Sequence, residues 1–204
     1  MSSVVPVEES IDPQPRRRLA RGDRYRQLLD VAWQLVSDEG TEALTLGRLA
    51  ERAGVTKPVV YDHFGIRSAL LVALYRDFDE RQAALMDAAL RESEPTLAGR
   101  ATVIASSYVD CVLLQGREIP GVIAALAGSP ELEKIKRDYE IVFIEKCRTV
   151  LAPFATTGTI ASPGLWAMLG AAEALSHAAA TGEISAGDAQ EELFETILTM
   201  VARN

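Results

Sequence analysis

The chain has 204 residues, 48% of them hydrophobic and 6% aromatic, so it can bury a sizeable and mostly aliphatic core. Its two cysteines exclude a dense disulfide framework and favour a reducing compartment, with the cytoplasm as the default. The net charge of −8 is uneven: residues 16–67 carry +3, whereas residues 68–204 carry −8, so only the N-terminal unit is suited to meet a polyanion.

Residues 1–15 precede the first predicted helix. They hold three acidic residues and three prolines and lack the apolar segment of a signal peptide, so we expect a disordered tail. We find no run of about 18 uncharged apolar residues, the length needed to span a bilayer, and expect no membrane contact.

Apolar residues at three- and four-residue spacing predict three helices in the next segment. The first covers residues 22–39, with Asp23 as its N-cap and Gly40 as its stop. The second is short, opens at Thr45 and closes at the turn Ala53–Val55. The third covers residues 57–64. Thr56 caps it, Pro58 lies in its first turn and Gly65 ends it.

A fourth helix is predicted over residues 66–92, and an Ala-rich region follows Glu94-Pro95. Further helices are predicted over residues 96–115, 119–127, 130–153, 163–181 and 185–202. No segment shows the alternation of a half-buried strand, so we predict an all-α fold of about nine helices. The expected organisation is a tail (1–15), a small three-helix unit (16–67) and a helical bundle (68–204).

Two short helices joined by a Gly-containing turn are the geometry that presents the second helix to a DNA major groove. Within the third predicted helix, Val60 and Phe64 are four residues apart and are expected to bury against the first two helices. The remaining side chains of that helix are then expected to face outward: Lys57, Pro58, Val59, Tyr61 and His63.

The segment from Tyr25 to Leu71 resembles the tetracycline-repressor (TetR) family. The matching features, at fixed spacing and without a gap, are Ala32, Gly40, Thr45-Leu46, Leu49-Ala50, Ala53-Gly54-Val55, Tyr61, His63-Phe64 and Arg67. The resemblance implies a dimeric, sequence-specific DNA-binding transcriptional regulator. It makes residues 16–67 a helix-turn-helix DNA-binding domain and residues 68–204 a ligand-binding and dimerisation domain. It implies a repressor that binds a pseudopalindromic double-stranded operator and is released by a small-molecule effector.

The same resemblance, with side-chain chemistry, assigns the DNA contacts. Thr45, Thr56 and Lys57 lie at helix N-termini, where free N–H groups favour phosphate. Pro58 and Val59 are suited to thymine methyl groups. The remaining predicted contacts are to phosphate or the minor groove, from Tyr61, His63, Arg67 and the arm Arg16, Arg17 and Arg18. Two alternatives stay open: the arm is a solvated tail, or His63 makes a structural hydrogen bond.

The resemblance also implies a homodimer that pairs through the last two helices. The first of them carries a set of small residues, Ala167, Gly170, Ala171, Ala174 and Ala178. The second carries an apolar stripe, Ala189, Leu193, Ile197 and Met200. Isologous packing of four helices would bury both sets. The alternative is that they belong to the core of a single chain.

Similar regulators hold their effector inside the C-terminal bundle. The expected wall residues are Tyr108, Cys111, Val112, Ile123, Phe143, Trp166, Leu169, Glu173 and His177. Glu173 and His177 share a helix face, either to orient a polar effector group or as a surface pair. Two ligands do not make a metal site, so no metal is expected. The break at Glu118–Gly121 either transmits ligand occupancy or is a plain connector.

Two other classes of function remain as alternatives. An enzyme is disfavoured because the sequence lacks a nucleophile elbow, a P-loop and a dinucleotide-binding Gly fingerprint, so we expect no cofactor and no turnover. A protein-binding adaptor with a weak DNA role is the second alternative. Steep salt dependence of DNA binding would separate a regulator from both.

Overall fold

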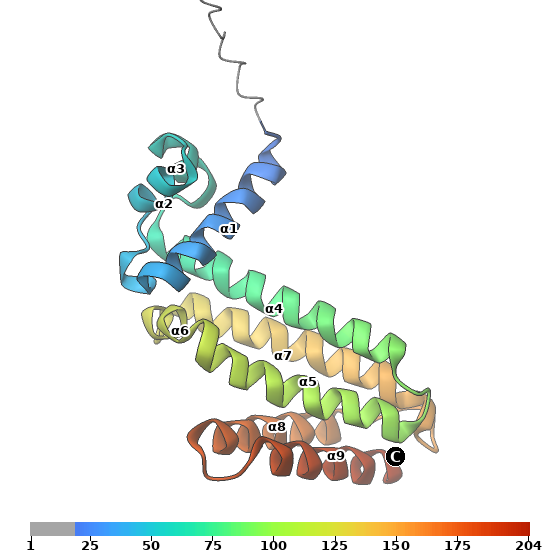
Figure 1. Ribbon diagram of the computed structural model, residues 1–204. Helices are drawn as coiled ribbons and strands as arrows, with labels where there is room; N and C mark the ends of the chain where they lie inside the picture. Colours follow the sequence, from blue (N-terminus) through green and yellow to red (C-terminus); the bar gives the residue numbers. More distant parts are fainter. Residues whose placement is uncertain (1–18) are drawn as a thin grey trace, which may run out of the picture.

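The protein is described here by a computed structural model that covers residues 19–204 (Figure 1). All regular secondary structure in this part of the chain is helical and none of it is strand, which confirms the predicted all-α class. The helices are α1 (Arg21–Glu39), α2 (Leu46–Ala53), α3 (Lys57–Phe64), α4 (Arg67–Glu92), α5 (Leu97–Glu118), α6 (Pro120–Leu126), α7 (Pro130–Leu151), α8 (Ser162–Thr181) and α9 (Ala186–Ala202), with short 3-10 helices η1 (Thr41–Ala43) and η2 (Ala152–Phe154).

Local sequence accounts for the ends of the first helices. The Thr45 Oγ1 accepts a hydrogen bond from the Arg48 N–H at 3.1 Å and caps α2 as predicted. Gly54 ends α2 with a φ of 64°, in the left-handed region that favours glycine. The prediction that Asp23 caps α1 is wrong: the N-cap residue is Ala20, and Asp23 lies in the first turn, where its charge suits the helix dipole.

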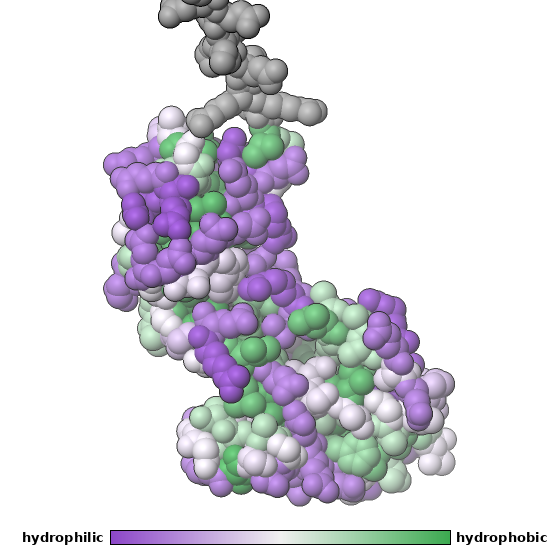
Figure 2. Space-filling view, in the orientation of Figure 1, coloured by the Kyte–Doolittle hydropathy of each residue, from purple (hydrophilic) through white to green (hydrophobic). Residues whose placement is uncertain are grey.

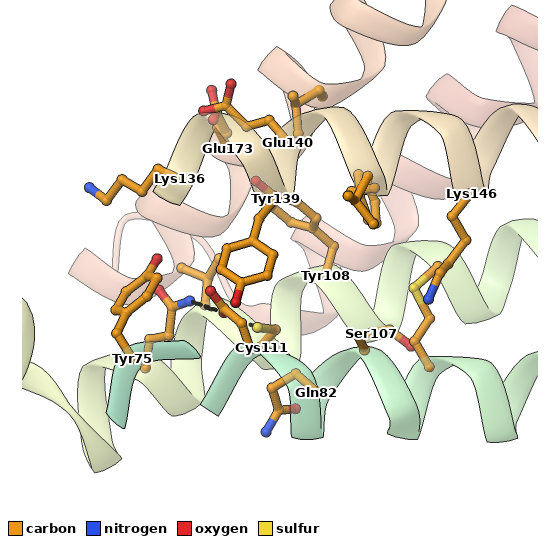
Figure 3. Close-up of a pocket in the computed structure, with 18 residues that line it drawn as sticks. Tyr75, Gln82, Ser107, Tyr108, Cys111, Lys136, Tyr139, Glu140, Lys146 and Glu173 are labelled. Carbon is orange, nitrogen blue, oxygen red and sulfur yellow. Dashed lines mark hydrogen bonds between the residues drawn. The ribbon is translucent and has the colours of Figure 1, made fainter. Parts of the chain in front are cut away.

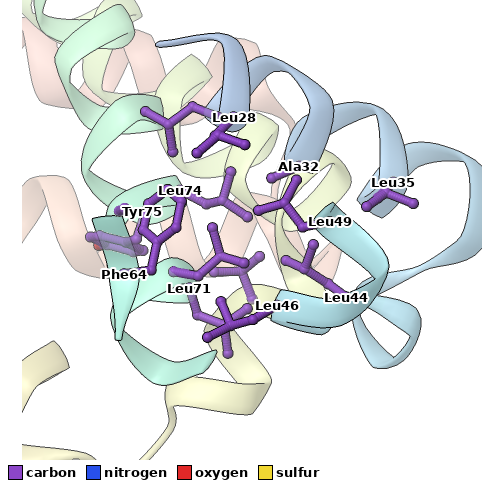
Figure 4. Packing of buried hydrophobic residues seen from close by; sticks show 14 of the residues in the cluster. Leu28, Ala32, Leu35, Leu44, Leu46, Leu49, Phe64, Leu71, Leu74 and Tyr75 are labelled. Carbon is purple, nitrogen blue, oxygen red and sulfur yellow. The ribbon is translucent and has the colours of Figure 1, made fainter. Parts of the chain in front are cut away.

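One hydrophobic core joins the three N-terminal helices to the bundle (Figure 4). It contains side chains of α1, α2 and α3, among them Leu28, Leu49 and Phe64, together with the first half of α4. It continues into α6 and α7 through Ile119, Val122, Leu126, Leu132 and Ile135. The predicted boundary at residue 67 therefore lies inside a packed core.

A second core fills the bundle formed by the end of α4 with α5, α7, α8 and α9. The apolar stripe of α9, predicted to face a partner subunit, lies within this core. The alternative is therefore correct for α9, since its stripe is covered by the protein's own chain.

α5 is long and apolar enough for a membrane span by composition alone, but it packs here against α4, α7, α8 and α9.

Different helices form the two ends of the molecule. In Figure 1, α2 and α3 lie at one end, and α8 and α9 form a layer at the opposite end. α4 runs from the first group into the bundle and connects the two. A change in the position of α4 therefore affects both.

Candidate nucleic-acid interface and cavity

α3 presents a polar surface on a buried anchor. Val60 and Phe64 are buried in the first core, as predicted, and fix the helix on α1, α2 and α4. Thr56, Lys57 and Pro58 are exposed at its N-terminal end. In Figure 2 the surface over α1–α3 is mostly hydrophilic, whereas apolar side chains are more frequent over the bundle below it. The geometry suits a helix that docks into a groove.

The remaining predicted contacts on α3 differ in exposure. Tyr61 is 52% exposed, so its hydroxyl is free to reach a ligand. Val59 and His63 are half-buried. The His63 ring lies 6.0 Å from the ring of Tyr25 and 6.2 Å from that of Phe64, so it packs in an aromatic group at the edge of the core. This packing favours a structural contribution of His63 beside any phosphate contact. Arg16, Arg17 and Arg18 lie outside the described residues.

Arg67 has an intramolecular role that its place in the motif did not predict. Its Nε donates to the Leu44 carbonyl oxygen and its Nη2 to the Thr41 carbonyl oxygen, both at 2.7 Å. The guanidinium thus ties the start of α4 to the η1 turn. The geometry argues against the predicted phosphate clamp, and the interface proposed below leaves Arg67 out.

Two further arginines on α2 hold the domain together. Arg48 pairs with Glu39 at 2.7 Å and with Glu51 at 3.3 Å. Arg52 pairs with Asp38 at 2.5 Å. The pairs with Glu39 and Asp38 tie α2 to the end of α1. They also neutralise local positive charge, which makes Lys57 the prominent cation at the N-terminal end of α3.

A buried carboxylate connects α1 to α4. Asp77 is 6% exposed and accepts hydrogen bonds from Arg26 Nη1 at 2.5 Å and from Trp33 Nε1 at 2.7 Å. Arg81 Nε lies 3.3 Å from the same carboxylate, and the Arg81 guanidinium lies over the Trp33 ring at 4.6 Å. This Asp77 network fixes α1 on α4, the helix that continues into the bundle.

A cavity of about 310 Å³ lies between α4, α5, α7 and α8 (Figure 3). Six of the nine predicted wall residues line it: Tyr108, Cys111, Val112, Phe143, Leu169 and Glu173. The other three lie elsewhere. Ile123 packs against the first core, Trp166 carries the Arg137 guanidinium 4.4 Å above its ring, and His177 is exposed on α8.

The sequence analysis missed the contribution of α4 to the cavity. Tyr75, Asp79, Gln82, Ala83 and Met86 line it from α4, and Tyr139 lines it from α7. The signal was present, because Tyr75, Asp79, Gln82 and Met86 recur at three- and four-residue spacing and share one helix face. Because Asp79 lies on this partly apolar face, its carboxyl could have been predicted to point toward the interior.

Asp79 is the unusual ionisable group of this cavity. Burial raises the pKa of its carboxyl from 3.8 to about 7, although a hydrogen bond from Gln115 Nε2 at 3.4 Å acts in the opposite direction. Burial also raises the pKa of the Cys111 thiol to about 12, so this cysteine stays a neutral wall residue near neutral pH.

Asp79→Asn is expected to stabilise the fold in a pH-dependent way. Because the folded-state pKa of Asp79 lies above its ordinary value, stability is lost as pH rises from about 4 through about 7. The asparagine side chain carries no charge, so the variant should gain about 1–3 kcal/mol over wild type at pH 8. The gain should shrink toward zero at pH 4. Urea unfolding at the two pH values measures this, and an equal gain at both would contradict it.

The fold and the exposed α3 define a helix-turn-helix unit on a helical bundle, and comparison with known proteins relates the N-terminal segment to a known family. Residues 28–79 match the family described as bacterial regulatory proteins, tetR family. This N-terminal segment therefore carries the TetR-family match that its sequence motif predicted.

Curated relatives match part of the chain, and two of them are described here. The chain is 42% identical over 57 residues to the HTH-type transcriptional activator FasR of Mycolicibacterium smegmatis, covering 28% of this chain and 26% of the relative. It is 49% identical over 47 residues to the tetracycline repressor protein class C of Escherichia coli, covering 23% and 22%. The matches span only about a quarter of each of these relatives.

The whole fold resembles solved structures. One is the multidrug binding protein EbrR complexed with imidazole, with a TM-score of 0.66 and 16% identity over 94% of this chain and 98% of that one. Sequence identity this low shows the fold alone. The bundle therefore shares its architecture with that structure, while its cavity chemistry must be taken from its own residues.

Proposed function

We propose that the protein is a transcriptional regulator that binds double-stranded DNA in a sequence-specific way. It acts in the cytoplasm and is not an enzyme. One observation carries this proposal: α3 exposes Lys57, Pro58 and Tyr61 on a helix anchored by buried Val60 and Phe64, in the segment that matches the TetR family. Thr45 and Thr56, at the N-termini of α2 and α3, complete the proposed phosphate contacts. Val59 and Pro58 are the proposed contacts to base edges.

We propose that a homodimer reads a pseudopalindromic operator. A single α3 covers few base pairs, and two copies reach half-sites about 34–36 Å apart or a multiple of that spacing. The support comes from α8, whose Ala167, Gly170 and Ala174 are exposed on the layer farthest from α3. Pairing there, with the exposed face of α9, would leave both copies of α3 free.

We propose that a small-molecule effector occupies the cavity and releases the operator. α4 lines the cavity with Asp79 and holds α1 through Asp77, so a ligand that favours one position of α4 also moves the helix-turn-helix unit. The shift cannot exceed the difference in the ligand's affinity for the two states. A ligand that tightened DNA binding instead would indicate a corepressor.

The test is fluorescence anisotropy with the DNA upstream of the protein's own gene, against a scrambled duplex and at two salt concentrations. Operator binding should prefer the native duplex, fall steeply with salt and saturate at two chains per palindrome. Equal, salt-insensitive binding to both duplexes would favour the adaptor alternative.

Lys57→Ala is expected to weaken DNA binding about tenfold and to lower the slope of log K against log salt by about one, because a phosphate contact is lost. Tyr61→Phe should weaken binding about three- to tenfold by removing one hydroxyl hydrogen bond. Lys134→Ala is the matched control, since Lys134 is an exposed cation on α7. Wild-type affinity in both α3 variants would contradict the placement of the reading helix.

A further inference from the structure

The cavity contains a carboxylate without a cationic partner. Among residues 19–204, no Lys, Arg or His nitrogen lies within 4.0 Å of the Asp79 carboxylate oxygens. Its hydrogen bond comes from the neutral Gln115 amide at 3.4 Å. Asp77, two residues earlier on the same helix, is by contrast satisfied by Arg26, Trp33 and Arg81. A half-buried carboxyl without a cationic partner weakens the fold, so its presence beside a cavity points to a ligand.

Aromatic rings from three helices share the cavity with this carboxyl. Tyr75 from α4, Tyr108 from α5 and Tyr139 from α7 all line the cavity with Asp79. The Tyr75 and Tyr139 rings lie 6.5 Å apart, and the Tyr108 ring lies 5.1 Å from that of Phe143. In Figure 3, Tyr139 reaches from α7 toward α4 and α5. Aromatic faces attract cations, most strongly where water is excluded.

The other charged groups of the cavity favour the same ligand. Glu173 adds a carboxylate, and so does Glu140, which pairs with Arg137 at 3.0 Å. Lys146 is already paired with Asp87 at 2.7 Å. Lys136 is exposed, and in Figure 3 the two lysines lie on either side of Tyr139. A positive ligand centre among the tyrosines would thus meet an unpaired carboxylate.

Building on the proposed function, in which this cavity holds the effector, we propose that the effector is an organic cation. The ligand is an amine or quaternary ammonium on an apolar, aromatic body, with its positive centre beside Asp79 and among Tyr75, Tyr108 and Tyr139. A cavity of about 310 Å³ fits a molecule of two fused or linked rings. The Asp79 carboxylate gives specificity, and the rings give affinity.

Binding of a permanently charged ligand should strengthen as pH rises from 6 to 8, because Asp79 ionises in this range. The titratable groups that face it do not compete. Burial raises the pKa of Tyr75, Tyr108, Cys111 and Tyr139, and that of Tyr139 reaches about 12. The remaining charged groups of the cavity are Lys136, Glu140 and Lys146 on α7 and Glu173 on α8.

The experiment compares two fluorescent probes that differ by one methyl group. The cation is the N-methylated styrylpyridinium dye with a dimethylaminophenyl ring, and the neutral probe is the same styrylpyridine without the N-methyl group. Titration of the full chain at pH 8, without DNA, measures each dissociation constant. The cation should bind at least about tenfold more tightly than the neutral probe.

Asp79→Asn tests the carboxylate directly, and it is expected to fold because it removes an unfavourable buried charge. It should weaken binding of the cation about tenfold or more and change binding of the neutral probe less than about twofold. Tyr139→Leu should also weaken binding of the cation, because it removes an aromatic face. Glu92→Gln is the matched control, since Glu92 is an exposed acid at the end of α4 and lies outside the cavity wall.

Three results would overturn the proposal: no binding of the cation to wild type, equal binding of the two probes, or unchanged cation binding in Asp79→Asn. A separate anisotropy titration tests DNA binding. Cation binding without operator binding would therefore refute the proposed regulator while leaving the ligand class intact. Operator binding without cation binding would refute the proposed ligand class while leaving the proposed regulator intact.

Discussion

Asp77→Ala is expected to destabilise the protein by about 2–3 kcal/mol, because it removes three polar contacts to one buried carboxylate. The Trp33 N–H would lose its acceptor in the interior. Arg26 and Arg81 would be harmed less, since their side chains are 59% and 47% exposed and remain hydrated. Urea unfolding followed by tryptophan fluorescence measures the loss.

Two companion variants separate the contributions within the Asp77 network. Asp77→Asn keeps an oxygen for the Trp33 N–H and should cost about 1 kcal/mol. Arg26→Ala removes one exposed partner and should cost less than about 1 kcal/mol. The free energy of unfolding of Asp77→Ala could instead lie within about 0.5 kcal/mol of wild type, the typical range of a neutral surface substitution. The network would then not hold α1 on α4. The proposed route from cavity to DNA would then lose its support.

Gly121→Ala is expected to disrupt the contact between α6 and η1. A methyl carbon at Gly121 would overlap the Thr41 Oγ1 and lie 2.9 Å from the Thr41 Cβ. Thr41 has little room to move, because it is buried and its carbonyl oxygen accepts the Arg67 hydrogen bond. Overpacking of this kind costs about 1–3 kcal/mol, and the shift of η1 should also weaken operator binding.

The assignment of this clash can be tested by restoring the space. In the double variant Thr41→Gly with Gly121→Ala, the methyl group moves to the other side of the contact, and much of the loss should be recovered as a favourable coupling energy. Gly116→Ala is the control, since a methyl group there meets no atom within 4 Å and should stabilise α5 by up to about 1 kcal/mol. Additive losses in the double variant would show that Gly121 and Thr41 do not interact.

The helices were predictable because their ends are set by neighbouring residues. α3 begins and ends at the predicted residues, Lys57 and Phe64, since Pro58 and Gly65 act locally. Thr56 is the N-cap residue as predicted, but its side chain makes no cap hydrogen bond. The failure at α1 has the same origin: Asp23 is a good cap residue, but the helix extends back to Arg21 without any side-chain cap. The anchor residues of α3 also followed from their spacing.

Contacts between distant segments could not be predicted. Arg67 bonds to carbonyl groups 23 and 26 residues earlier, and no local pattern indicates this partner. An amphipathic stripe on α9 shows that Leu193 and Ile197 are covered, but not by which chain. The cavity was found only in part, because no residue of α4 was among the predicted wall residues, although the sequence analysis placed residues 68–204 in the ligand-binding domain.

The core shared between α1–α3 and α6–α7 restricts how this architecture can be recombined. A chimera that joined residues 1–67 to another regulator's bundle would separate Leu28 and Phe64 from the side chains of α6 that complete their core. Ile119 and Val122 would have to travel with the N-terminal segment, or be matched by equivalent residues in the new host. Exchange of DNA specificity between regulators of this kind is therefore simpler by replacing the exposed residues of α3 than by transplanting the whole unit.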